Sequence, residues 1–157
     1  MRRALVFLLP FLAACGGADG GRDVSEPEEG RSRGLEGHYQ GSEKTRPGDR
    51  LCMIEEGDNA ARFAFVTLGE GRAACSGLGR AQRSADTLTL TLEGDGECEF
   101  EARIEAGRIT FPQSVPDGCA YYCSEAASLA SRIFDKSAGG LDAARSPRDL
   151  VGDPLCR

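Results

Sequence analysis

The chain has 157 residues, 7 cysteines and a formal net charge of −6. This length suits one domain of ordinary size and excludes a large multidomain enzyme. The acidic balance argues against nucleic-acid binding, because a groove that neutralises phosphates needs clustered positive charge. DNA and RNA are therefore not expected as partners, and cationic partners are favoured at long range.

The N-terminus has the pattern of an export signal. Arg2 and Arg3 precede an apolar run at residues 4–12, which is too short to span a bilayer as a permanent helix. The run ends in Leu12-Ala13-Ala14-Cys15, and here the chain resembles bacterial lipoproteins, whose lipobox is a Leu, two small residues and a Cys. The resemblance implies that residues 1–14 are a lipoprotein signal peptide and that Cys15 becomes the lipidated first residue. The alternative is an ordinary signal peptide cleaved after Ala14.

The same resemblance implies attachment to a membrane through a lipid anchor. Several acyl chains such as palmitate hold a protein durably, because each buried CH₂ adds about 0.8 kcal/mol. Gly16 stands where the family's inner-membrane retention signal has Asp, so the outer membrane is implied, with the domain in the periplasm or at the cell surface. Residues 15–36 carry few large apolar side chains and predict a flexible tether, with a reach of roughly 25 Å.

Six cysteines remain, and an even set in an exported domain predicts three disulfides. They are Cys52, Cys75, Cys98, Cys119, Cys123 and Cys156. A zinc site is disfavoured because the chain has one His and a single Cys-x₃-Cys spacing, so neither a metal nor another cofactor is expected. Sequence does not choose among the pairings, but we favour Cys75 with Cys98 and a bond from Cys156 that joins the tail to the body.

Residues 37–157 form the predicted domain, and its clearest signals are short strands and Gly-rich turns. Residues 86–93 alternate Leu with Thr, and residues 97–105 alternate apolar with charged side chains, so each segment buries one face. The Gly-Asp-Gly turn at 94–96 joins them into a hairpin. Further strands are predicted at 37–41, 50–55, 62–68, 72–75, 79–83 and 108–111.

About eight sequential strands joined by brief turns predict a mainly β fold, a small antiparallel meander or barrel stabilised by disulfides. The inward side chains are apolar and predict a filled interior. One C-terminal α-helix is predicted at about 124–138, with Ser124 as N-cap, an apolar stripe and Gly139-Gly140 at its end.

This plan is similar in topology to the calycin barrels of lipocalins, although the chain has no Trp for their Gly-x-Trp motif. An exported lipoprotein of this size with a disulfide-tied small barrel also resembles the bacterial inhibitors of host lysozyme. The second resemblance implies a binding role toward a cationic enzyme. Both resemblances concern architecture, which alone does not define function.

An acidic run supplies the first candidate binding residues. Glu97, Glu99 and Glu101 share one predicted strand face at about 6.7 Å intervals, from the rise of a strand. They would attract a basic partner in a salt-dependent manner. The simpler interpretation is a solvated outer face whose charges prevent pairing between strand edges.

The peptide Cys119-Ala-Tyr-Tyr-Cys123 supplies the second candidate, since Tyr121 and Tyr122 lie between two thiols. Aromatic rings on a pinned loop are good binding anchors, because they lose little entropy when they bind. The simpler interpretation is that the rings cover the end of the barrel where the predicted helix docks.

The sequence therefore predicts a non-enzymatic binding module for a protein or an envelope component, with a cationic, lysozyme-like target among the candidates. Catalysis is not expected, because no nucleophile or phosphate-loop motif occurs and His38 is the sole imidazole. Two alternatives remain open: a structural or assembly factor of the outer membrane, and a carrier of a small ligand inside the barrel.

Overall fold

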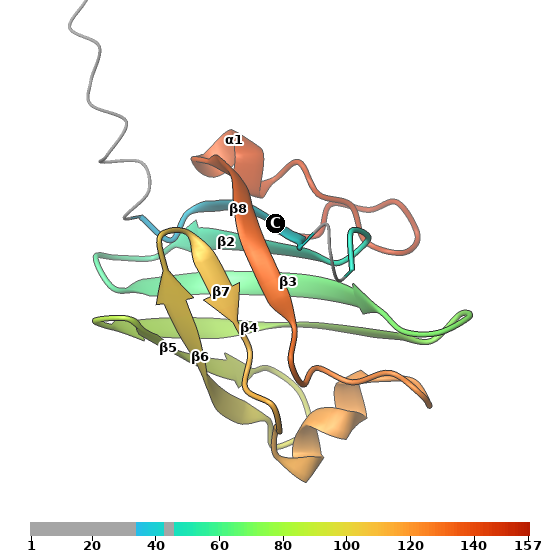
Figure 1. The fold of residues 1–157 in the computed structure, drawn as a ribbon. Helices are drawn as coiled ribbons and strands as arrows, with labels where there is room; N and C mark the ends of the chain where they lie inside the picture. The colour runs from blue at the N-terminus through green and yellow to red at the C-terminus, as the bar shows by residue number, and fades with distance from the viewer. Residues whose placement is uncertain (1–33, 43–45) are drawn as a thin grey trace, which may run out of the picture.

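The computed structural model describes residues 34–42 and 46–157, so the predicted signal peptide, Cys15 and most of the predicted tether lie outside the described residues. The strands form one closed antiparallel barrel in chain order, with β8 paired to β1 (Figure 1). This confirms the predicted mainly β fold. The elements are β1 (Gly37–Gly41), β2 (Arg50–Glu55), β3 (Ala60–Leu68), β4 (Ala74–Ser84), β5 (Thr87–Leu92), β6 (Glu99–Glu105), β7 (Arg108–Thr110), the 3₁₀ helix η2 (Asp117–Tyr122), β8 (Ile133–Gly139) and α1 (Leu141–Ala144).

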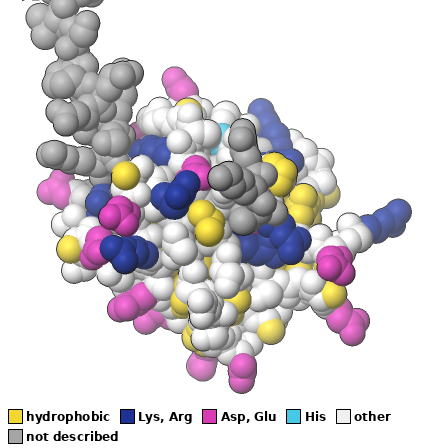
Figure 2. All heavy atoms as spheres, in the orientation of Figure 1, with side chains coloured by type: hydrophobic (Ala, Val, Ile, Leu, Met, Phe, Trp, Pro, Cys, Tyr) yellow, Lys and Arg dark blue, Asp and Glu magenta, His cyan; other side chains and the backbone are white. Residues whose placement is uncertain are grey.

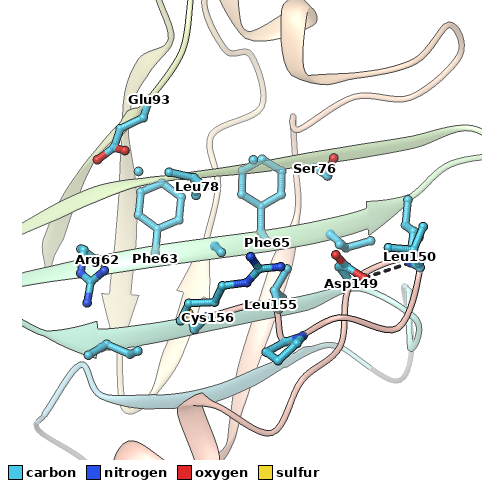
Figure 3. Close-up of a pocket in the computed structure, with 18 residues that line it drawn as sticks. Arg62, Phe63, Phe65, Ser76, Leu78, Glu93, Asp149, Leu150, Leu155 and Cys156 are labelled. Carbon is cyan, nitrogen blue, oxygen red and sulfur yellow. Dashed lines mark hydrogen bonds between the residues drawn. The ribbon is translucent and has the colours of Figure 1, made fainter.

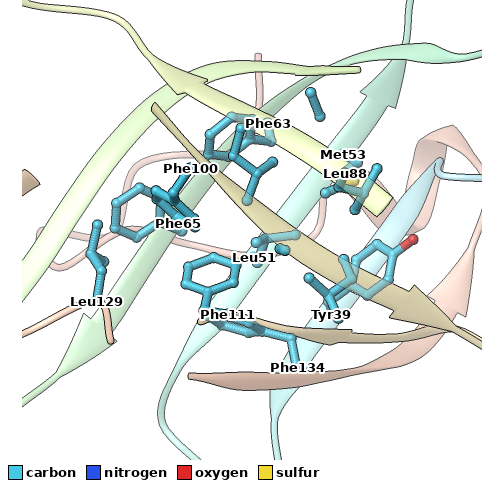
Figure 4. Packing of buried hydrophobic residues seen from close by; sticks show 14 of the residues in the cluster. Tyr39, Leu51, Met53, Phe63, Phe65, Leu88, Phe100, Phe111, Leu129 and Phe134 are labelled. Atoms are coloured by element: carbon cyan, nitrogen blue, oxygen red, sulfur yellow. The ribbon is translucent and has the colours of Figure 1, made fainter. Parts of the chain in front are cut away.

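The interior of the barrel is filled with side chains, as predicted from the alternating pattern. Phe111 packs against Phe100 and Phe134, with ring centroids 4.9 and 5.3 Å apart, and Figure 4 shows these rings gathered in the interior. Phe63 and Phe65 enter the same cluster. A filled interior offers no support for carriage of a ligand inside the barrel.

The predicted helix at 124–138 is wrong, because residues 133–139 form β8 and close the barrel. Phe134 is fully buried between the half-buried Ile133 and Asp135, which is the period of a strand. Ala126 and Ser131 have φ values of 67° and 58°, which no α-helix accommodates. Backbone pairing to β7 and β1 therefore outweighs the helical periodicity of the sequence. The short C-terminal α-helix is instead α1, which follows β8.

The segments 72–75 and 79–83, predicted as two strands, are one strand, β4. Residues 74–82 of β4 pair with β3 without a break, and the glycines of β4 do not interrupt it. A Cβ at Gly77 would lie 3.1 Å from a ring carbon of Phe65, and a Cβ at Gly79 would collide with the Thr91 carbonyl of β5. About eight strands were predicted and the barrel has eight, because this merger of two predicted strands is offset by β8, which was predicted as part of a helix.

The N-terminal end of the barrel, where β1 begins, is closed by residues that were assigned to the tether. Leu35 is 2% exposed and belongs to the core, so the domain begins before residue 37. The Tyr39 hydroxyl donates to the Leu35 carbonyl at 2.7 Å, and Lys136 Nζ donates to the Gly34 carbonyl at 2.6 Å. Burial, and next the charge of Glu55, raise the pKa of Tyr39, which therefore stays a hydrogen-bond donor.

The opposite end of the barrel contains a buried ion pair. Arg132 Nη1 lies 2.9 Å from Asp49 Oδ2, and the two side chains are 7% and 1% exposed. The Leu68 N–H donates to the other Asp49 oxygen at 2.7 Å, and Arg132 donates to the Leu68 carbonyl at 3.0 Å. Burial raises the pKa of Asp49, and the Leu68 N–H and then Arg132 oppose the rise. The pair fixes the irregular segment before β8 to the end of β3.

Candidate functional site

All six cysteines of the domain are paired, which confirms the three predicted disulfides: Cys52–Cys156, Cys75–Cys123 and Cys98–Cys119. The bond from Cys156 joins the tail to the body, as predicted. The favoured Cys75–Cys98 pairing is wrong. Strand β5 lies between β4, which carries Cys75, and β6, and both cysteines bond instead to the segment that contains η2.

Two of these disulfides hold the Tyr loop, residues 117–123, against the barrel at the end opposite Leu35. In Figure 1, η2 lies at the bottom of the view and α1 at the top. Tyr122 is half-buried, and its hydroxyl donates to the Gly96 carbonyl at 2.8 Å. Tyr121 is 63% exposed and meets Tyr122 edge to face, with ring centroids 5.2 Å apart. Tyr122 thus covers the barrel end, whereas Tyr121 faces solvent.

The turn between β5 and β6 fits closely beneath this loop. A Cβ at Gly96 would lie 2.6 Å from the Tyr121 Cβ, so the close approach requires Gly at this position. A Cβ at Gly118 would likewise meet the Glu97 carbonyl. The Tyr loop and the first predicted acidic residue are therefore in direct contact.

The acidic residues are less regular than predicted, because β6 begins at Glu99 and leaves Glu97 in the preceding connection. Glu99 and Glu101 are exposed on the outer face of β6, and the Thr91 hydroxyl donates to Glu99 at 2.8 Å. Within the described residues, no ion pair involves Glu97, Glu99 or Glu101. Some other surface charges are paired, as for Arg80 with Glu93, and charges of both signs are mixed on the face that Figure 2 shows.

The structure also contains a feature that the sequence interpretation missed, which we call the tail groove. It has a volume of about 610 Å³ and lies between the outer faces of β2, β3 and β4 and the tail, residues 149–157. Figure 3 shows Leu155 of the tail across from Leu78 of β4. Leu78, Leu150 and Val151 are 53%, 57% and 85% exposed. An outward Leu between two glycines was the available sequence signal.

A shallower pocket of about 490 Å³, which we call the loop pocket, connects the tail groove to the Tyr loop. Ser76 and Leu150 line both depressions. Arg72, Tyr121 and Ser124 line the loop pocket alone. The exposed ring of Tyr121 and the exposed apolar side chains of the groove therefore belong to one continuous surface.

Residues 34–42 and 46–157 contain no group of three or more His, Cys, Asp or Glu side chains that could hold a metal ion. No helix within the same ranges has the length and apolar character needed to cross a bilayer. His38 is half-buried on the outer side of β1, and burial, with a smaller effect of Arg50, lowers its pKa.

Comparison of the chain with protein-family models, with curated proteins and with solved structures finds no match. The fold and the site define the molecule as a closed eight-stranded antiparallel barrel with three disulfides. Its aromatic loop and apolar groove are joined on one surface.

Proposed function

We propose that this protein is an exported, lipid-anchored, non-enzymatic module that binds a cationic protein partner. The Tyr loop supplies the anchor of the interface, and Glu97, Glu99 and Glu101 supply the charge. The observation that carries the proposal is the 63% exposure of Tyr121 on a segment held by two disulfides.

Rigidity is what separates this loop from an ordinary exposed turn. Cys98–Cys119 and Cys75–Cys123 fix both ends of the Tyr loop, and the Tyr122 hydroxyl bond fixes its centre. A ring held in this way loses little conformational entropy on binding, which is the main advantage of a preorganised contact. The unpaired carboxylates beside it add long-range attraction for a basic partner.

The position of the chain's entry into the barrel agrees with this role. Leu35 docks at the N-terminal end, whereas η2, which carries Tyr121, lies at the opposite end. If acylated Cys15 holds the protein at the outer membrane, the Tyr loop is carried on the side of the domain remote from the attachment point.

Titration with a cationic lysozyme tests the proposal, with inhibition of muramidase activity as a second readout. Tyr121→Ala is expected to weaken binding by about tenfold or more, the usual size of an anchor residue's effect. Glu101→Gln is expected to reduce the association rate and the salt dependence. Leu141→Ala, on the exposed surface of α1, is the matched control and should change neither. Equal affinity for Tyr121→Ala and the unaltered protein, or the absence of salt-sensitive binding, would contradict the proposal.

A further inference from the structure

We propose that the tail groove binds the hydrocarbon chain of a single-chain anionic amphiphile, with its head group in the adjoining loop pocket at Arg72. This site is distinct from the interior of the barrel, which is filled. It does not rest on the protein-partner proposal, because the tail groove lies on the outer faces of β2, β3 and β4, although the loop pocket shares Tyr121 with the Tyr loop.

The groove has the size and the surface that a hydrocarbon chain requires. Its volume of about 610 Å³ lies within the range of small-molecule sites. Ala64 and Val66 of β3 line its floor, and Leu78 and Leu155 line its sides. Exposed Leu150 and Val151 extend the apolar surface along the tail. Burial of this surface by a ligand is favourable in proportion to the area removed from water.

The backbone around the groove disfavours an extended peptide as the occupant. A bound strand gains much of its affinity from main-chain hydrogen bonds. Strand β3 is already paired to β2 and to β4. In the tail, the N–H groups of Val151 and Asp153 donate to the Asp149 side chain, and those of Asp149 and Leu155 donate to the carbonyls of Asp153 and Pro147. A hydrocarbon chain needs no such bonds.

The charges at the two ends of the groove differ and give the ligand a direction. At one end Arg62 bonds to Glu56 and Arg80 lies near Glu93, so these charges are neutralised. At the other end the loop pocket contains Arg72, which forms no ion pair with the described residues. Ser76 also lines this pocket, and the Ser124 hydroxyl there already donates to the Ala74 carbonyl at 3.1 Å. The Asp149 carboxylate lines the groove beside Leu150, where it accepts hydrogen bonds from the N–H groups of Val151 and Asp153. Arg72 therefore favours an anionic head group over a cationic one in the loop pocket.

The tail forms one wall of the tail groove and is covalently fixed to the barrel, so the groove exists without a ligand. Cys52–Cys156 joins the tail to β2 across 104 positions of sequence. The Arg50 guanidinium also donates to the Arg148 carbonyl at 2.8 Å, just before the tail. A preformed site avoids the ordering cost of closing a flexible segment over the ligand.

The test is a calorimetric titration of residues 15–157 with palmitate below its micellar concentration, in a Cys15→Ser background that carries no acyl group of its own. Leu78→Glu and Val151→Glu are expected to raise the Kd about tenfold or more, since each places a charge on the apolar path. Leu141→Glu, a comparable change on α1, should leave it unchanged. Both altered groove positions are exposed, so folding is expected to persist and is checked by circular dichroism.

A second arm tests the head group. Arg72→Glu should weaken palmitate binding about tenfold, and dodecyltrimethylammonium, a cationic single-chain amphiphile, should bind the unaltered protein more weakly than palmitate. Failure of palmitate to bind, or equal binding by Leu78→Glu, Val151→Glu and Leu141→Glu, would overturn the proposal. Glu101→Gln should affect lysozyme binding alone, so failure of this proposal and failure of the protein-partner proposal are distinguishable.

Discussion

Replacement of Arg132 by Ala is expected to lower the free energy of unfolding by about 3–5 kcal/mol at neutral pH, as is typical when one partner of a buried ion pair is removed. Asp49, at 1% exposure, would then have the Leu68 N–H as its remaining hydrogen-bond partner and only the weaker attraction of Arg46 to offset its burial. Urea unfolding with the disulfides intact measures the loss. Arg108→Ala, which breaks the exposed pair of Arg108 with Asp135, is the control and should have a much smaller effect.

The same variant has a defined pH dependence. Burial already raises the pKa of Asp49, and loss of Arg132 removes an interaction that opposes the rise. A carboxyl group whose folded-state pKa is raised opposes folding when it is ionised, and its protonation relieves the penalty as the pH falls through that pKa. The stability difference between Arg132→Ala and the unaltered protein should therefore shrink at acidic pH. Adding Asp49→Asn should abolish this pH dependence; a difference that stays constant with pH in both backgrounds would be inconsistent with the buried pair.

Replacement of Phe134 by Ala is the second large effect, with an expected loss of about 3–5 kcal/mol. Phe134 is fully buried in β8, and its ring packs against Phe111 at 5.3 Å between centroids. Truncation leaves a cavity at the seam where β8 closes the barrel. Thermal and urea unfolding measure the loss.

Phe134→Leu retains most of the volume and is the matched control, with an expected loss below about 1.5 kcal/mol. Ala138→Gly, at an exposed position of the same strand, separates a packing effect from a strand effect. A loss below about 1 kcal/mol for Phe134→Ala would contradict the placement of this ring in the core.

The sequence was most informative where one face of a strand is buried and the other is exposed to solvent. Leu88, Leu90 and Leu92 are buried as their alternation predicts, and Phe100 and Ile104 follow the same rule in β6. In these strands the local pattern and the tertiary structure require the same conformation. The turn at 94–96 was predictable for a similar reason, since its glycines permit both the turn and the approach of the Tyr loop.

The closing strand could not be predicted in this way. Residues 126–134 carry an apolar stripe with helical spacing, but Ile133 and Phe134 are needed to pair with β7 and β1. Closure of a barrel depends on partners far away in the sequence, which a local pattern does not contain. The predicted Cys75–Cys98 pairing was wrong for the same reason. The closed barrel places the Tyr loop over both cysteines, and the local sequence does not show this.

The candidate surface likewise has some features that the sequence predicts and one that it does not. Two thiols flanking Tyr121 and Tyr122 marked the Tyr loop in the sequence, and the acidic run was evident from composition. The tail groove was not, because it exists only when Cys156 brings residues 149–157 back over β3. Features encoded by neighbouring residues were thus accessible to sequence reasoning, whereas features made by distant segments were not.

The most direct test of the account is intact-mass analysis of the protein isolated from the envelope of a host that processes lipoproteins. The account predicts a chain that begins at Cys15, carries acyl groups on that residue and has lost six hydrogen atoms, two for each of its three disulfides. Peptide mapping should return the pairs Cys52–Cys156, Cys75–Cys123 and Cys98–Cys119. A chain without acyl groups, with its first 14 residues retained and its thiols reduced, would contradict it.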